Sequence, residues 1–348
     1  MPKTFFSLAL TDQVELLNAV SARSGHPAPL LEKDVWVVGT LACLFSSSLA
    51  DRLTFKGGTS LSKAYNVINR FSDDLDLTYD IRSLLPEMAT TPDGIPPTSS
   101  QAAKWTKAVR SRLPQWIQGR VVPILQAALA DSGMEASLEI IGKDSDSILV
   151  KYAPLSQGTG NVAPNVKLEF GARSTGEPCE VLPVICDLAP FVPEIMFPHA
   201  HLRVMKMERT FWEKATAIHV FCRHAKIRGS RFARHWHDLL QLAATERIQN
   251  SLLDKSWLEQ VVRHKTMFFQ EKDPTGTAID YRECLNGQLC LVPDGIEREA
   301  LRDDYCNMVQ DGIFFTEAPE FDVILDKCAH LQEKINSGHT NSETSLRA

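Results

Sequence analysis

One stretch near the start of the chain limits the possible folds more than any other. Residues 53–55 (Leu-Thr-Phe) form a strand candidate that ends in the Gly-Gly pair 57–58, and the residues that follow predict a helix over 59–68. Glycines at the end of a strand let a ligand come close to the backbone. The start of the next helix offers free N–H groups, which favour phosphate. The stretch therefore predicts a strand–turn–helix unit with a phosphate site at its turn.

A strand with two acidic residues is predicted shortly after this helix. Residues 74–79 (Asp-Leu-Asp-Leu-Thr-Tyr) alternate along the strand, so that Asp74 and Asp76 point to one side. Asp73 points to the other side and is the weaker candidate. Two carboxylates one strand step apart can hold metal ions roughly 3.5–4 Å apart. Oxygen ligands beside a phosphate favour Mg²⁺, with Mn²⁺ as the other possible ion.

The glycine pair and the acidic pair are weak signals alone, but their order along the chain is specific. Residues 56–77, KGGTSLSKAYNVINRFSDDLDL, resemble the signature of the polymerase-β-type nucleotidyltransferase superfamily. Within it they are most similar to the AbiEii/AbiGii toxin family, whose members pair with an antitoxin in bacterial phage defence. Residues 32–37, EKDVWV, resemble the run that precedes this motif in the family. The resemblance covers roughly residues 30–245.

The order of elements predicts an α+β chain. The first 50 residues look helical, a long helix is expected over 101–131, and strand candidates or apolar stretches follow at 135–141, 147–153, 164–170 and 181–186. From about residue 201 the pattern turns mainly helical. Together with the resemblance, this implies two domains. A polymerase-β-type nucleotidyltransferase domain, a small mixed sheet with helices, would occupy residues 1–200, and a helical domain over 201–348 would contribute Lys and Asp motifs to the cleft.

The resemblance also implies a third carboxylate on a later strand. In residues 166–170 (Val-Lys-Leu-Glu-Phe) the apolar side chains face one way, while Lys167 and Glu169 face the other. Glu169 is the candidate, either as a metal ligand or as the base for the acceptor hydroxyl. The competing interpretation is an ordinary solvent-facing Glu at a sheet edge, and Asp187 is the alternative acid.

Two later segments are similar to further motifs of the family. Residues 209–214 (RTFWEK) resemble the motif whose Lys contacts the nucleotide triphosphate, which implies this role for Lys214. Residues 231–239 (RFARHWHDL) resemble the motif with an active-site Asp, here Asp238. A Lys for a phosphate and an Asp to orient it make chemical sense together. Either residue could instead be half of a structural ion pair.

The candidate site residues therefore form three overlapping groups. The candidate catalytic residues are Asp74, Asp76, Glu169, Lys214 and Asp238. The candidate metal ligands are Asp74, Asp76 and Glu169. The candidate nucleotide-binding residues are Lys56, Gly57, Gly58, Thr59, Ser60, Lys63 and Lys214.

Charge is distributed unevenly along the chain. The formal net charge is −6, so the molecule as a whole does not attract nucleic acid. Residues 201–235, however, hold nine Lys or Arg against two Glu, and we expect this basic segment to face the carboxylates. The side chains expected on the acceptor backbone are some of Arg223, Lys226, Arg228, Arg231 and Arg234. A solvated or internally paired helix face is the competing interpretation.

Other residue types exclude several classes of protein. No run of eighteen or more apolar residues occurs, so no membrane span is expected. The eight cysteines contain no CxxC pair, which favours free thiols in a reducing cytoplasm over disulfides or zinc. The aromatic residues of the basic segment are expected in an interdomain core rather than in a base-stacking platform. They are Phe211, Trp212, Phe221, Phe232 and Trp236.

Three functions compete. The first is transfer of a nucleotide from an NTP to an RNA acceptor, for which the resemblance favours tRNA and implies a cognate antitoxin as partner. The second is an NTP-binding regulator without turnover, which the intact pair of Asp74 and Asp76 disfavours. The third is a small-molecule transferase of the aminoglycoside-modifying kind, which shares the glycine and acidic motifs.

Overall fold

The structure, a computed structural model, describes residues 3–155, 163–224 and 231–345. The chain divides into two compact units, each of which takes up several stretches of the sequence. The sheet unit consists of Met1–Tyr65, Ser72–Gly94 and Lys104–Met205, and the helical unit of Asn66–Phe71, Ile95–Ala103 and Lys206–Ala348. Within the described ranges, every helix is too short or too polar to cross a membrane.

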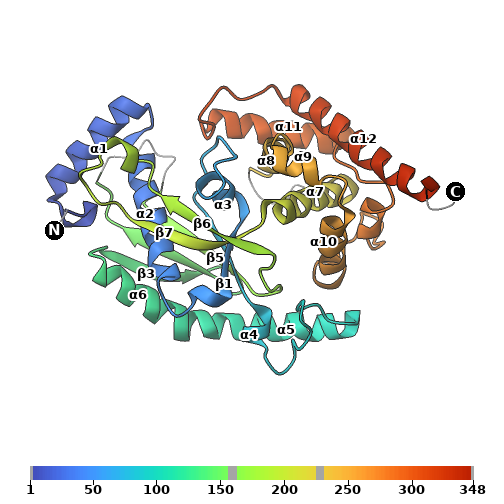
Figure 1. Ribbon diagram of the computed structural model, residues 1–348, viewed down its shortest axis with the longest axis horizontal. Coiled ribbons are helices and arrows are strands. Elements are labelled where there is room, and N and C mark those ends of the chain that lie inside the picture. Colours follow the sequence, from blue (N-terminus) through green and yellow to red (C-terminus); the bar gives the residue numbers. More distant parts are fainter. Residues whose placement is uncertain (1–2, 156–162, 225–230, 346–348) are drawn as a thin grey trace. The chain divides into compact units, whose positions relative to one another are not determined.

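A mixed seven-stranded sheet lies at the centre of the sheet unit (Figure 1). Its strands β1 to β7 are Leu53–Lys56, Leu75–Tyr79, Ala136–Ile141, Ser147–Tyr152, Asn165–Gly171, Cys179–Ile185 and His199–Met205. They lie in the order β3-β4-β5-β2-β1-β7-β6. β2 is antiparallel to β1 and parallel to β5, and β1 is parallel to β7. The two strands of the glycine and acidic motifs, β1 and β2, are therefore interior strands.

The helices of this part of the chain are α1 (Leu10–Ser24), α2 (Ala28–Phe45), α3 (Gly57–Lys63), α4 (Ile81–Leu84), α5 (Ser99–Trp116) and α6 (Val122–Asp131), with the π-helical turn Ile117–Val121 joining the last two. Two of them, α2 and α5, place aromatic side chains on the apolar face of the sheet. Trp36 of α2 stacks on Tyr152 with 4.4 Å between ring centroids, and Trp116 of α5 stacks on Tyr79 at 4.1 Å. Because side chains alternate along a strand, the opposite face of β2 and β5 carries their polar residues.

The helical unit has a core of aromatic residues. Its helices are α7 (Met207–His224), α8 (Arg234–Ala243), α9 (Glu246–Ser251), α10 (Lys255–Phe268), α11 (Gly295–Gln310) and α12 (Phe321–Ser345). Phe211, Trp212, Phe221 and Trp236 are buried, and the rings of Phe221 and Trp236 meet edge to face at 5.3 Å. Phe232 is half-buried against Phe221 at 5.2 Å. These residues are thus part of the core of the helical unit, and the expectation of a core between the domains stays a prediction.

The fold class expected from the sequence is confirmed: an α/β mixture around a mixed sheet, followed by a helical region. The helix expected over 59–68 is shorter, because α3 ends at Lys63 and the chain turns at Asn66, whose φ of 53° is left-handed. Strand β7 was not expected. Only Leu202 and Val204 alternate as buried apolar residues in this strand, and the histidines and the arginine around them hide the pattern in the sequence.

Candidate active site

Asp74 and Asp76 lie at the start of β2. Both are half-buried, whereas Leu75 and Leu77 between and beyond them are fully buried in the core. The alternation expected for this strand is therefore confirmed, and the two carboxylates share the polar face of the sheet.

Asp76 is the middle residue of a polar row across three strands. Its Cα is the partner of Lys56 on antiparallel β1 and of Glu169 on parallel β5. Side chains of residues that are paired across strands point to the same face. Glu169 therefore lies on the same face of the sheet as Asp76. Lys56 lies on this face too, on the other side of Asp76.

Lys167 is a basic residue within this acidic group, for which the sequence suggested no role. Its Nζ forms an ion pair with Glu169. Partial burial lowers the pKa of Lys167, but the hydrogen bond to Glu169 and the charges of Glu169, Asp74 and Asp76 outweigh burial and raise it. Lys167 is therefore a cation that partly neutralises the carboxylates of this face.

The donor atoms of this face suit a divalent ion. Asp74, Asp76 and Glu169 offer only carboxylate oxygens, which are hard ligands of the kind that Mg²⁺ binds. In the part of the chain that the structure describes, no group of three or more His, Cys, Asp or Glu side chains is gathered closely enough to hold a metal. Glu169 instead pairs with Lys167. A three-carboxylate site would thus need Glu169 to change partners.

Gly57 lies directly against the Asp76 carboxylate. Its φ is 77°, and a Cβ on this residue would lie 1.9 Å from Asp76 Oδ2. Only glycine combines the left-handed backbone with this close approach. The first glycine of the motif is therefore required because it lets the turn after β1 pass beside the acidic pair.

Gly57→Ala is expected to lower any activity that depends on Asp76 by about a hundredfold, because the methyl group must displace the Asp76 carboxylate from its position. Gly25→Ala is the matched control. Gly25 has nearly the same φ, 76°, but a Cβ there meets nothing within 4 Å. Both variants carry a backbone strain of about 1–2 kcal/mol. Initial rates and thermal unfolding of the two variants separate strain from displacement, and equal losses of activity would contradict the role given to Gly57.

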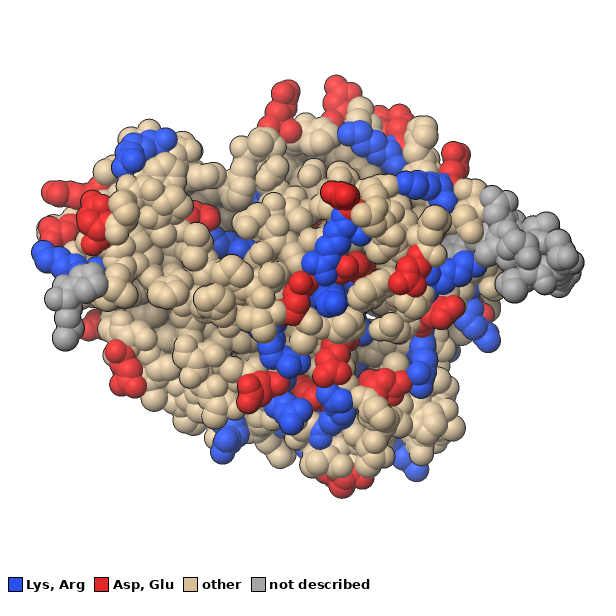
Figure 2. Space-filling view, viewed as in Figure 1, with Lys and Arg blue, Asp and Glu red and all other residues tan. Residues whose placement is uncertain are grey.

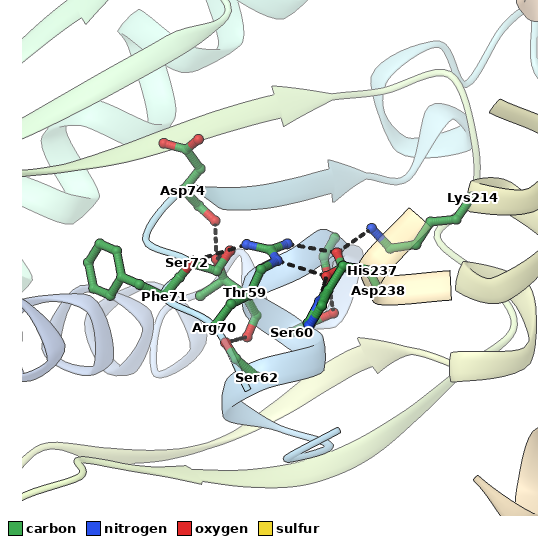
Figure 3. Close-up of polar contacts among 11 residues, drawn as sticks. Thr59, Ser60, Ser62, Arg70, Phe71, Ser72, Asp74, Lys214, His237 and Asp238 are labelled. Carbon is green, nitrogen blue, oxygen red and sulfur yellow. Dashed lines mark hydrogen bonds and ion pairs between the residues drawn. The ribbon is translucent and has the colours of Figure 1, made fainter. Parts of the chain in front are cut away.

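Thr59 and Ser60 are fully buried, and their hydroxyl groups are used inside the protein. Thr59 Oγ1 donates to the backbone carbonyl of Asp74 at 2.6 Å and lies 2.9 Å from Ser72 Oγ, as Figure 3 shows. Ser60 Oγ donates to the carbonyl of Gly57 at 2.8 Å. These hydroxyls hold the glycine turn and the approach to β2 in place.

Lys63 is held between two carboxylates of the sheet unit. Its Nζ pairs with Asp34 of α2 and lies 2.6 Å from Asp187 Oδ1. Burial raises the pKa of Asp34 to about 6, in spite of the lowering by Lys63. Burial lowers the pKa of Lys63, but the two carboxylates outweigh it, so Lys63 stays charged. Asp187, the alternative third acid, is thus a partner of Lys63.

The residues of the EKDVWV run have clear structural partners that the sequence did not reveal. Lys33 is buried, forms an ion pair with Asp73 and donates to the carbonyl of Ala163 at 3.1 Å. Glu32 Oε1 accepts from the backbone N–H of Leu155 at 2.8 Å. Asp73 therefore faces α2, away from the acidic pair, as the alternation predicts.

A buried charge cluster in the helical unit contains both Lys214 and Asp238. Arg70 Nε and Nη2 donate to the two carboxylate oxygens of Asp238, each at 2.7 Å. Lys214 Nζ lies 2.8 Å from Asp238 Oδ2 (Figure 3). The side chains of Arg70, Lys214 and Asp238 are 3%, 9% and 0% exposed, so water screens these contacts very little. Lys214 and Asp238 do form an ion pair, and Arg70, for which no role was expected, is the third member.

This cluster contains two cations and one anion. Burial would raise the pKa of Asp238, but Arg70 and then Lys214 outweigh it and hold that pKa well below its usual range. Burial lowers the pKa of Lys214, and Asp238 offsets part of this effect. Asp238 already accepts two hydrogen bonds from Arg70, whereas Lys214 has three donors and gives one to Asp238.

Part of the basic segment is paired within the helical unit. Arg209 pairs with Glu213, Arg223 with Glu283 and Arg231 with Asp311. On the face seen in Figure 2, Lys and Arg side chains alternate with Asp and Glu and form no continuous basic surface. Lys226 and Arg228 lie outside the described residues. Internal pairing therefore accounts for some of the described cations of the segment, and contact of the segment with an acceptor stays a prediction.

The sequence matches the family model described as "Nucleotidyl transferase AbiEii toxin, Type IV TA system" over residues 40–327. The chain belongs to this family. The resemblance seen in the motifs is thus confirmed over most of the chain, and the protein is an enzyme of the nucleotidyltransferase class, a toxin of the type IV toxin–antitoxin kind. Membership implies a nucleotide substrate, a cognate antitoxin and the use of a divalent metal.

Other comparisons add less. No curated protein matches the chain. Among solved structures, MenT4, a nucleotidyltransferase toxin from Mycobacterium tuberculosis H37Rv, is similar over 92% of this chain and 98% of that one, with 18% sequence identity and a TM-score of 0.43. Roles of single residues do not transfer at this level of similarity.

Proposed function

We propose that this AbiEii family member transfers a nucleotide from an NTP to an RNA acceptor such as tRNA, and that it uses Mg²⁺. The observation that carries the proposal is the row Lys56–Asp76–Glu169, with Gly57 against the Asp76 carboxylate. This row joins acidic metal donors, a cation and an open backbone turn. A nucleotide triphosphate with its divalent ion requires these three features.

Asp74, Asp76 and Glu169 would hold the divalent ions. When bound, such ions neutralise charge on the triphosphate and favour loss of the proton from the acceptor hydroxyl. Glu169 either completes this set or accepts that proton, because its carboxylate lies on the same face. Lys56 and the turn at Gly57 and Gly58 would contact the phosphates. Thr59, Ser60 and Lys63, whose polar groups bind within the protein, would shape the turn.

Lys214 is proposed to contact the triphosphate with the donors that Asp238 does not use. Its pKa is lowered mainly by burial, and an anionic phosphate beside it would favour its charged form. That Lys214 and the acidic pair reach the same nucleotide in a cleft, with residues 1–200 and 201–348 as the two domains, remains a prediction. So does contact of Arg223, Arg231 and Arg234 with an RNA backbone.

The biological context follows the family. We propose that the protein acts in the cytoplasm in phage defence and that a cognate antitoxin restrains it. Growth arrest on expression of the wild type, relieved by co-expression of a neighbouring antitoxin gene, is the expected result. An arrest that persists in the Asp74→Ala/Asp76→Ala variant would contradict a toxin that acts by nucleotide transfer.

Incubation of the purified protein with each labelled NTP, Mg²⁺ and total RNA tests the proposed activity. Label in a tRNA-sized band, lost on addition of EDTA, is expected. Label in aminoglycosides but not in RNA would favour the small-molecule transferase. NTP binding by calorimetry without transfer to either acceptor would favour the regulator without turnover.

Lys167→Met is expected to lower the Mg²⁺ concentration needed for half-maximal activity by about two- to fivefold, since a partly exposed ion pair contributes at most about 1 kcal/mol. Lys167 competes with a metal ion for Glu169 and the acidic pair. Mg²⁺ titrations of the wild type and the variant measure the shift. Lys151→Met is the matched control, because Lys151 pairs with Glu139 elsewhere in the sheet. A rise in the required Mg²⁺ would contradict competition by Lys167.

A further inference from the structure

The short segment Asn66–Phe71 belongs to the helical unit, although Tyr65 before it and Ser72 after it belong to the sheet unit. Within the helical unit, the segment pairs with the chain after α11. Phe71 N–H donates to the carbonyl of Ile313 at 2.6 Å, and Phe315 N–H donates to the carbonyl of Asn69 at 3.1 Å. Arg70 and Phe314 form the β-bridge between these two bonds.

Arg70 fixes this segment more strongly than the backbone pairing does. Its guanidinium holds both oxygens of Asp238, which is 168 residues away in the sequence, and it also donates to the carbonyl of Phe71 at 3.0 Å. Both charged groups are buried, and a guanidinium stays protonated in proteins. Removal of Asp238 leaves Arg70 as a buried charge without this counter-ion, whereas removal of Arg70 leaves Asp238 with Lys214 alone. The Arg70–Asp238 pair is therefore a rigid anchor.

The anchored segment leads directly to the acidic pair. Only three residues, Phe71, Ser72 and Asp73, lie between Arg70 and Asp74. Between them, Thr59 bonds to Ser72 and to the Asp74 carbonyl. The approach to β2 is thus held at two points, by Thr59 within the sheet unit and by Arg70 within the helical unit (Figure 3).

We propose that Arg70 is a positioning residue for Asp74 and Asp76, and that Asp238 affects the reaction through Arg70 and not through contact with the substrate. The two oxygens of Asp238 are both taken by Arg70, and one of them also by Lys214. Asp238 is therefore committed to the anchor, and Lys214 is the member of the cluster with donors for a ligand. The kinetic test of this role rests on the proposed function, whereas the structural test by hydrogen exchange does not.

The kinetic test is a double-mutant cycle with Arg70→Gln, Asp238→Asn and the double variant. Each single variant is expected to lower kcat roughly 10- to 100-fold through misplacement of the acidic pair, and Arg70→Gln is expected to leave KM for the NTP nearly unchanged. The double variant is expected to be no slower than the slower single variant. Losses that multiply would show that Asp238 acts on the reaction independently of Arg70, and a raised KM in Arg70→Gln would show that Arg70 acts in substrate binding; either result would overturn the proposal.

The structural test is hydrogen exchange of the peptide that covers residues 66–76, which needs no activity. Arg70→Gln and Asp238→Asn are both expected to speed its exchange, and Lys214→Ala is not, because the Arg70–Asp238 bonds remain. Arg302→Ala, which breaks a surface pair with Asp322 in the same unit, is the matched control. Unchanged exchange in Arg70→Gln overturns the anchor. If the wild type has no transferase activity but the variants show this exchange pattern, the proposed function is wrong and the role of Arg70 as an anchor still holds.

Discussion

Asp76→Ala and Asp74→Ala are each expected to lower the rate of nucleotide transfer by about a thousandfold or more, because each removes a donor to the ions that stabilise the transferred phosphate. Neither side chain belongs to the core, since both are half-buried beside fully buried leucines. The free energy of unfolding should therefore stay close to that of the wild type. Initial rates with labelled NTP over a range of Mg²⁺ concentrations, together with thermal unfolding, measure both quantities.

Asp73→Ala is the control for this prediction, and the structure indicates its expected effects on activity and on stability. Asp73 pairs with the buried Lys33, not with the acidic pair. The variant should keep transferase activity per folded molecule but unfold at a lower temperature, because Lys33 loses its ionic partner. Loss of activity in Asp73→Ala equal to that in Asp76→Ala, without loss of stability, would show that the assigned faces of β2 are wrong.

The elements that the sequence predicted well are those with a local signal. The alternation of residues 74–79 predicted both β2 and the shared face of its two carboxylates, and the strand candidates at 135–141, 147–153 and 164–170 became β3, β4 and β5 within a residue or two. Gly57 was identified as a point of close approach, and the structure shows the atom that approaches it, Asp76 Oδ2. The alternation of apolar and polar residues along a strand and the glycines of a turn can both be recognised within a short stretch of sequence.

The partners of the charged residues could not be predicted in the same way. Arg70 forms an ion pair with Asp238, which is 168 residues away in the sequence, and Lys63 forms one with Asp187, which is 124 residues away. Nothing in a single sequence marks which acidic residue a buried cation will meet, because the pairing is decided by packing of whole elements. The EKDVWV run shows the same limit, since three charged residues in a row suggest an exposed helix face, yet Glu32 and Lys33 are buried.

Asp238→Ala is expected to lower the free energy of unfolding by about 3–5 kcal/mol, because it leaves a buried cation without its counter-ion. Two buried cations, Arg70 and Lys214, depend on this carboxylate. Chemical unfolding of the wild type and the variant measures the difference. The control is Asp322→Ala, which removes the partner of the partly exposed Arg298 and Arg302 and should cost at most about 1 kcal/mol.

The pH dependence of stability gives a second measurement of the same cluster. The folded-state pKa of Asp238 is held well below its usual range by Arg70 and Lys214 in spite of burial, while the unfolded value is about 3.9. A carboxylate with a depressed pKa contributes its full stabilisation above the unfolded value and loses it as the pH falls through the folded value. The stability difference between wild type and Asp238→Asn should therefore be constant from neutral pH down to about pH 5 and shrink only in stronger acid. A difference that already shrinks between pH 8 and pH 6 would assign the effect to another group, because Asp238 does not titrate there.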